Sequence, residues 1–143
     1  MKPINNFFYY FAWMGILGLI GIVLITTYWY VAPYEVLTFQ NGNNVLLEKT
    51  VKSGGYLQVK EKYCKKMKLP ASVSRKFIDG VVYQVPIYIE NRPVGCGEII
   101  EYVYIPKALP AGRYQATIIY TYQVNPLRKM NYELTTEFFD IVK

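Results

Sequence analysis

The order of apolar and polar positions divides the chain into two parts. From Phe7 to Val31 no residue is charged, and the middle of this stretch is almost wholly aliphatic. After Pro33, apolar and polar residues alternate, and short clusters of turn-forming residues interrupt the alternation. A continuous apolar run predicts a helix in apolar surroundings, whereas a period of two predicts half-buried strands. We therefore expect one apolar helix followed by a domain of strands.

The apolar run is long enough to cross a bilayer. A spanning helix needs roughly 20 apolar residues, because in lipid every backbone N–H and C=O must be satisfied within the segment. Aromatic residues prefer the headgroup layer, and they occupy both ends of the run, with Trp13 at one end and Tyr28, Trp29 and Tyr30 at the other. We predict a cytoplasmic tail over residues 1–6, a transmembrane helix over residues 7–32 and an exported domain over residues 33–143.

Two other interpretations of the run are a cleaved signal peptide and a buried core helix. A signal peptide has an apolar stretch of roughly 7 to 15 residues followed by a small-x-small cleavage site. Here the stretch continues into bulky aromatic residues and then Ala32-Pro33, which favours an uncleaved signal anchor. A core helix would need other helices to cover it, and the rest of the chain has no helical pattern.

Flanking charge predicts the orientation of the helix, because positive residues stay preferentially on the cytoplasmic side. Lys2 and the amino group precede the run. Glu35 and Glu48 follow it, and no Lys or Arg occurs between the run and Lys49. We expect a single pass through the cytoplasmic (inner) membrane, with the N-terminus inside and the C-terminal domain in a periplasm or extracellular space.

The exported part is predicted to be mainly β. Turn residues such as Asn41-Gly42, Asp79-Gly80 and Asn125-Pro126 separate its apolar runs. Seven short strands without a helix predict an antiparallel sandwich. The seven runs are 34–40, 45–51, 56–63, 81–90, 98–105, 113–124 and 132–142.

The stretch Leu109-Pro110-Ala111-Gly112-Arg113-Tyr114 resembles the approach to strand F in immunoglobulin-like and fibronectin-type sandwiches. The resemblance implies that Tyr114 forms a tyrosine corner, in which its hydroxyl bonds the backbone a few residues upstream. Ala116 stands where antibody-type domains have their second cysteine, and no tryptophan follows Trp29. The domain is therefore similar to the wider Ig-like group, and the whole chain to small membrane-anchored envelope proteins of bacteria and their phages.

Composition disfavours catalysis. Hydrophobic residues make up 52% of the 143 residues and histidine is absent, which removes the commonest general base and the commonest metal ligand. Glu98 and Glu101 are three apart, which sends them to opposite faces of a strand. Glu133 and Glu137 share a face that we expect to be solvated, and Asp79-Gly80 is predicted to form a turn. With Glu90 included, the spacing of these acidic residues singles out no catalytic pair of carboxylates. We expect no enzyme activity, no catalytic residue, no cofactor and no metal.

Cys64 and Cys96 are the only cysteines, and both belong to the predicted exported domain. An oxidising compartment favours a disulfide between them, which would stabilise the domain by roughly 3 to 4 kcal/mol. In the cytosol they would be two thiols. A zinc site is not supported, because the chain has neither a Cys-x-x-Cys spacing nor a histidine.

Charge is the remaining feature, since the chain carries a formal net charge of +6. The densest basic segment is a candidate contact for anionic lipid, acidic polysaccharide or an acidic partner. The alternative is a solvated strand edge on which lysine blocks aggregation. The segment contains Lys60, Lys62, Lys65, Lys66, Lys68, Arg75 and Lys76.

Tyrosine-rich alternation at residues 102–105 and 118–122 has two interpretations. These residues form either a sugar-stacking face or ordinary cross-strand packing.

These patterns predict a single-pass membrane protein that presents an Ig-like domain for protein–protein interaction. It would be a subunit of an envelope complex or a phage-encoded envelope factor, and it could form an oligomer. The alternative is a module that binds carbohydrate or anionic lipid. Nucleic-acid binding is not expected, because the chain is tethered to a membrane and has no nucleic-acid motif.

Overall fold

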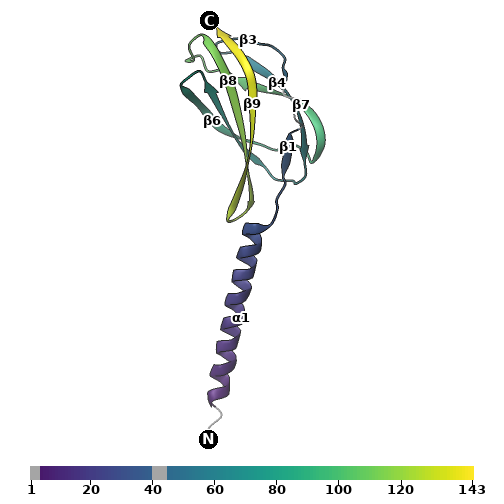
Figure 1. Ribbon diagram of the computed structural model, residues 1–143, viewed down its shortest axis with the longest axis vertical. Helices are drawn as coiled ribbons and strands as arrows, with labels where there is room; N and C mark the ends of the chain where they lie inside the picture. Colours follow the sequence, from purple (N-terminus) through teal and green to yellow (C-terminus); the bar gives the residue numbers. More distant parts are fainter. Residues whose placement is uncertain (1–3, 40–44) are drawn as a thin grey trace. The chain divides into compact units, whose positions relative to one another are not determined.

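The computed structural model describes residues 4–39 and 45–143. Within these residues the chain forms one α-helix followed by nine β-strands (Figure 1). The helix belongs to one compact unit, and residues 34–124 and 129–143 form a second, the β domain.

The helix α1 spans Ile4–Val31. Its segment Phe7–Val31 has a mean hydropathy of 2.1, and none of the residues in this segment is buried. At 1.5 Å per residue this segment is about 37 Å long, which exceeds the roughly 30 Å of a hydrocarbon core. The hydroxyls of Thr26 and Thr27 donate to the carbonyls of Ile22 and Val23, at 2.9 and 2.7 Å. The helix is therefore long and apolar enough to cross a membrane, as predicted.

Sheet A is built around strand β4, and all its pairs are antiparallel. Strands β1 and β2 pair with one edge of β4, and β7 pairs with the other through ten consecutive residue pairs. The bounds are β1 Leu37–Phe39, β2 Val45–Leu46, β4 Tyr56–Lys65 and β7 Gly95–Tyr104.

Sheet B has the strand order β3-β9-β8-β5-β6. Strands β5, β6 and β8 pair antiparallel, whereas β3 pairs parallel with β9. The bounds are β3 Thr50–Lys52, β5 Ala71–Ile78, β6 Val82–Glu90, β8 Gly112–Asn125 and β9 Arg128–Val142.

The prediction of a mainly β domain is confirmed, but the seven antiparallel strands are not. Strand β5 was not predicted, because Ser72, Ser74 and Arg75 dilute its apolar alternation and the register shifts between Val73 and Arg75. The run predicted as one strand over residues 45–51 forms two short strands in different sheets. The parallel pair β3–β9 also departs from an all-antiparallel arrangement.

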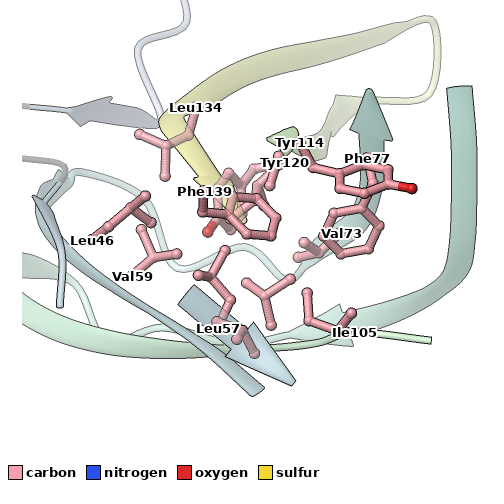
Figure 2. Close-up of a cluster of buried hydrophobic side chains, with 14 of the residues drawn as sticks. Leu46, Leu57, Val59, Val73, Phe77, Ile105, Tyr114, Tyr120, Leu134 and Phe139 are labelled. Atoms are coloured by element: carbon pink, nitrogen blue, oxygen red, sulfur yellow. The ribbon is translucent and has the colours of Figure 1, made fainter. Parts of the chain in front are cut away.

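The two sheets contribute to one buried core. Side chains of sheet A, including Leu57 and Val59, point toward Val73, Phe77 and Phe139 of sheet B (Figure 2). They come from alternate positions of their strands, as the alternation predicted. This apolar end of the core also contains the buried ring of Tyr114, whose hydroxyl donates to the Pro110 carbonyl at 3.1 Å. A tyrosine corner requires this bond.

Candidate functional site

The other end of the core is charged. The inward positions of β4 continue from Leu57 and Val59 to Glu61, Tyr63 and Lys65. On β7 the inward position opposite Val59 is Glu101. We call the charged and phenolic side chains that meet here the buried ion cluster. Its members are Glu61, Arg75, Tyr88, Glu90, Arg92, Glu101 and Tyr120.

Arg92 lies at the centre of the buried ion cluster, in the connection between β6 and β7. Its Nη1 is 2.9 Å from Glu61 Oε2, its Nε is 2.6 Å from Glu90 Oε1, and its Nη2 is 2.9 Å from Glu101 Oε2. Nη2 also donates to the Tyr120 hydroxyl at 2.7 Å, and the guanidinium carbon is 4.6 Å from the centroid of that ring. The guanidinium of Arg92 thus contacts three carboxylates and the hydroxyl of Tyr120, which lies on β8 of sheet B.

Glu101 has the most complete set of partners. Arg75 Nη2 contacts its Oε1 at 2.5 Å, and the Tyr88 hydroxyl donates to the same oxygen at 2.8 Å. Its Oε2 faces Arg92 and the Tyr120 hydroxyl. Burial raises the pKa of Glu101, but hydrogen bonds from Tyr120, Arg75 and Tyr88 outweigh it and hold this pKa below its usual value. Glu101 is therefore a stable anion.

Glu61 has fewer partners. Its side chain is completely buried, and Arg92 is the one guanidinium that contacts it among the described residues. Burial, followed by the charge of Glu101, raises the pKa of Glu61 from 4.5 to about 7. The pKa values of these two neighbouring carboxylates therefore shift in opposite directions, because their partners differ.

Lys65 joins the margin of the cluster. Its side chain is buried, its Nζ donates to the Arg92 carbonyl at 2.8 Å, and it lies 5.6 Å from the centroid of the Tyr122 ring. Burial lowers the pKa of Lys65. This ammonium helps to fix the backbone that carries Arg92.

The geometry indicates what the cluster can do. The side chains of Glu61, Arg92, Glu101 and Arg75 are between 0% and 11% exposed, so a dissolved substrate does not reach them. The contacts of Tyr120 with Glu61 and Glu101 join sheet B to sheet A. The cluster can thus hold the sheets together and bind a proton.

The predicted basic segment does not form one surface. Lys60 and Lys62 point outward from sheet A and face Glu98, at 2.7 and 3.8 Å. Lys66 pairs with Glu35 at 2.5 Å, and Lys68 is exposed.

Three predicted anion contacts lie elsewhere. Lys65 and Arg75 belong to the interior, and Lys76 is half-buried in sheet B. The prediction that all seven basic residues contact one anionic surface is therefore corrected. Successive side chains along β4 and β5 point to opposite faces of their sheets, so these three lie apart from the others.

The acidic residues divide in the same way. Glu98 is exposed and Glu101 is buried, so the two lie on opposite faces, as predicted. Glu133 and Glu137 are exposed, and Asp79 lies in a turn where its carboxylate accepts from the Val81 N–H at 3.2 Å. Among the described residues, no group of three His, Cys, Asp or Glu side chains is placed to hold a metal ion.

The predicted cysteine pair is bonded in the structure. Cys64 and Cys96 are directly opposite each other on β4 and β7, and their sulfur atoms are 2.09 Å apart. The bridge lies on the outer side of sheet A, on the face that carries Lys60 and Lys62. It therefore fixes the register of β7 against β4.

The outer side of sheet A also carries unshielded apolar side chains. Tyr56 and Tyr104 are opposite each other with ring centroids 5.5 Å apart, and Tyr102 is opposite Gln58. Tyr56 and Tyr102 are 57% and 56% exposed. We call this surface the aromatic face. Its members are Val45, Leu47, Tyr56, Ile100, Tyr102 and Tyr104.

The tyrosine-rich alternation thus has two outcomes. Tyr102 and Tyr104 are exposed, whereas Tyr120 and Tyr122 are buried and pack between the sheets.

A shallow groove of about 400 Å³ lies on the outer side of sheet B, between the exposed Ile87 and Ile89 of β6 and the polar side chains of β5 and β8.

Sequence reasoning missed Glu61, Arg92 and Tyr120. Glu61 lies in a lysine-rich run and was therefore assigned to the charged surface. Its spacing of two and four residues from Val59 and Leu57 places it on the inner side of the strand. That spacing was the available signal. Arg92 lies in the connection between β6 and β7, and nothing in its neighbours Asn91 and Pro93 indicates that it is buried.

Comparison with known proteins gives no family. No protein-family model matches the chain, and no curated protein matches it.

Proposed function

We propose that the chain is a single-pass membrane protein that presents its β domain outside the cytoplasmic membrane, where the aromatic face binds a protein partner. The N-terminus would remain in the cytoplasm. Support for the membrane location comes from the uncharged segment Phe7–Val31 and its exposed apolar side chains. The Cys64–Cys96 bridge supports an oxidising compartment for the domain.

The observation that carries the binding role is the aromatic face. Monomeric soluble proteins rarely leave contiguous apolar patches uncovered, and tyrosine is enriched at protein interfaces. Here three tyrosines and three aliphatic side chains stand on one side of a regular sheet. The neighbouring Lys60 and Lys62 both pair with Glu98, which suits a polar rim around an apolar contact.

Site-specific photocrosslinking in intact membranes tests this proposal. A photoreactive amino acid would replace Tyr102 in the full chain, and as a matched control it would replace Thr135, which is exposed on sheet B. We expect a defined adduct at position 102 that is absent at position 135. An adduct of twice the chain mass would identify a second copy as the partner. Equal labelling at both positions, or none, would contradict the proposal.

Carbohydrate binding is a second candidate, because the exposed rings of Tyr56, Tyr102 and Tyr104 offer flat surfaces for stacking on sugars. It predicts that Tyr102→Ala abolishes retention on immobilised polysaccharide, with no protein adduct at position 102. Anionic lipid binding has less support, because the predicted cations are divided between the surface and the interior.

A further inference from the structure

The Tyr120 hydroxyl stands between two carboxylates. Its oxygen is 3.2 Å from both carboxylate oxygens of Glu61, and it also hydrogen-bonds Glu101 Oε2. On its remaining side it accepts a hydrogen bond from Arg92 Nη2 at 2.7 Å. A phenol has one proton to donate. The phenol can donate its hydrogen bond to only one of the two carboxylates. The second carboxylate then faces the phenol oxygen without a hydrogen atom between the two oxygens, unless this carboxylate is itself protonated.

The partners of the two carboxylates decide which one is protonated. Glu101 contacts two guanidiniums, Arg75 and Arg92, and accepts from the Tyr88 hydroxyl, so its negative charge is well compensated. Glu61 contacts only Arg92 among these cations, and Arg92 is shared with Glu90 and Glu101.

The other charged and phenolic groups around Glu61 do not change the number of cations that contact its carboxylate. They are Tyr63 and Lys65 on β4, Arg75 on β5, Tyr88 and Glu90 on β6, Arg92 in the connection, Glu101 on β7, and Tyr120 and Tyr122 on β8. The Lys65 ammonium donates to a backbone carbonyl, and no contact of it with Glu61 is present in the described chain. Glu61 is therefore the carboxylate with a deficit of positive charge.

We propose that Glu61 carries a proton in the folded protein and donates a hydrogen bond to the Tyr120 hydroxyl, which donates its own hydrogen to Glu101. This chain of hydrogen bonds fastens sheet A to sheet B. Loss of the proton leaves two carboxylates facing one phenol oxygen in a region closed to water. The fold thus contains a proton-dependent clasp that is closed in mild acid and weakened in mild base.

The sign of the pH effect follows from linkage. The pKa of Glu61 is raised from 4.5 to about 7 in the folded state, so the folded protein binds more protons than the unfolded chain between these values. Its contribution to stability is present below pH 4.5 and is lost as the pH rises through about 7. Glu101, whose pKa is lowered, stays ionised across this range. We expect the folding equilibrium constant to fall roughly 10- to 100-fold between pH 5 and pH 8.

Urea unfolding of the full chain in detergent micelles, with the disulfide intact, tests the clasp. Near-ultraviolet circular dichroism of the tyrosines would follow the β domain at pH 5 and pH 8. Wild type should be the more stable at pH 5, whereas Glu61→Gln, which keeps the shape and removes the titration, should lose most of this difference. The matched control Glu98→Gln, on the exposed side of β7, should behave as wild type. A wild-type stability that is flat or rises toward pH 8 would overturn the proposal.

A measurement on the wild type alone guards against a variant that does not fold. In the full chain with ¹³C-labelled glutamate carboxyls, nuclear magnetic resonance should detect one carboxyl that titrates between pH 6 and pH 8. If every glutamate carboxyl titrates below about pH 5.5, Glu61 is not protonated near neutral pH and the proposal is wrong.

Discussion

The helix and the β domain distribute apolar and charged side chains in opposite ways. In α1 most of the large apolar side chains face outward, with exposed fractions from 49% at Trp13 to 74% at Tyr30. In the β domain, Glu61, Lys65, Arg92 and Glu101 face inward and are at most 6% exposed. Each arrangement is costly in water unless something compensates it. The helix needs an apolar solvent around it, and the cluster needs its own counter-charges.

This difference separates two kinds of constraint. In the proposed membrane location the helix would obtain its partners from the lipid, so any apolar residue of similar size would fit. The buried ion cluster obtains its partners from five strands and one connection of the β domain, so each member depends on the geometry of the others. Tolerance to substitution should therefore be high in the helix for apolar changes and low in the cluster for any change.

The largest expected effect concerns charge in the helix. Leu17→Arg combined with Ile20→Arg places two cations near the middle of α1, each costing about 2.5 to 3.5 kcal/mol on an insertion scale. The double variant should leave the membrane fraction during alkaline extraction. Leu17→Ala with Ile20→Ala, which changes size but not charge, should stay. If the double arginine variant stays in the membrane fraction, α1 does not depend on an apolar environment and the contrast with the β domain is wrong.

Removal of the central cation of the cluster should come next. Arg92→Met leaves Glu61, Glu90 and Glu101 without their shared guanidinium, and breaking a buried ion pair costs about 3 to 5 kcal/mol. Urea unfolding at pH 8 measures this loss. Arg113→Met, which removes an exposed guanidinium from the face of Phe138, is the control and should cost far less. Equal costs would show that the cluster does not stabilise the fold.

The disulfide should have a somewhat smaller effect. Cys64→Ser with Cys96→Ser removes a bridge across a separation of 32 residues and should lower the free energy of unfolding by about 3 kcal/mol. Reduction of the wild type should produce the same loss. Because the bridge lies on the outer side of sheet A, the difference in stability between pH 5 and pH 8 should persist. Loss of that difference would show that the bridge and the cluster are coupled.

The smallest expected effect compares one substitution at the two ends of the core. Tyr114→Phe removes a hydrogen bond to a carbonyl and should cost about 1 kcal/mol, whereas Tyr120→Phe removes contacts with charged groups and should cost about 2 to 3 kcal/mol. Thermal unfolding of the two variants beside wild type gives the ratio. Equal losses would mean that the apolar and charged ends of the core are energetically alike.

The parts of the fold that the sequence predicted are those in which one period dominates. The uncharged run predicted α1 to within a few residues, and strict alternation predicted β4, β7, β8 and β9. Strand β5 was missed because serine and basic residues occupy its middle. The pairing of Thr50–Lys52 with β9 was also out of reach, since a three-residue strand carries too little pattern to choose a partner.

The candidate site was predictable only in part. Glu61 and Glu101 occupy inner positions of alternating strands, so a search for charges on the apolar phase of each strand would have found both. It would not have found Arg92, whose place depends on where the connection after β6 turns back over the core. A cluster assembled from distant segments is a property of the folded chain and not of any one stretch.

Exposure of the β domain to protease tests the central claim most directly. Spheroplasts of cells that produce the full chain with a C-terminal epitope would be treated with protease, and the membranes would then be washed with alkaline carbonate. We predict that the epitope disappears from intact spheroplasts while untreated chain remains in the washed membranes. An epitope that survives in intact spheroplasts and is degraded only after lysis, or a chain recovered in the carbonate supernatant, would contradict a membrane-anchored domain presented outside the cell membrane.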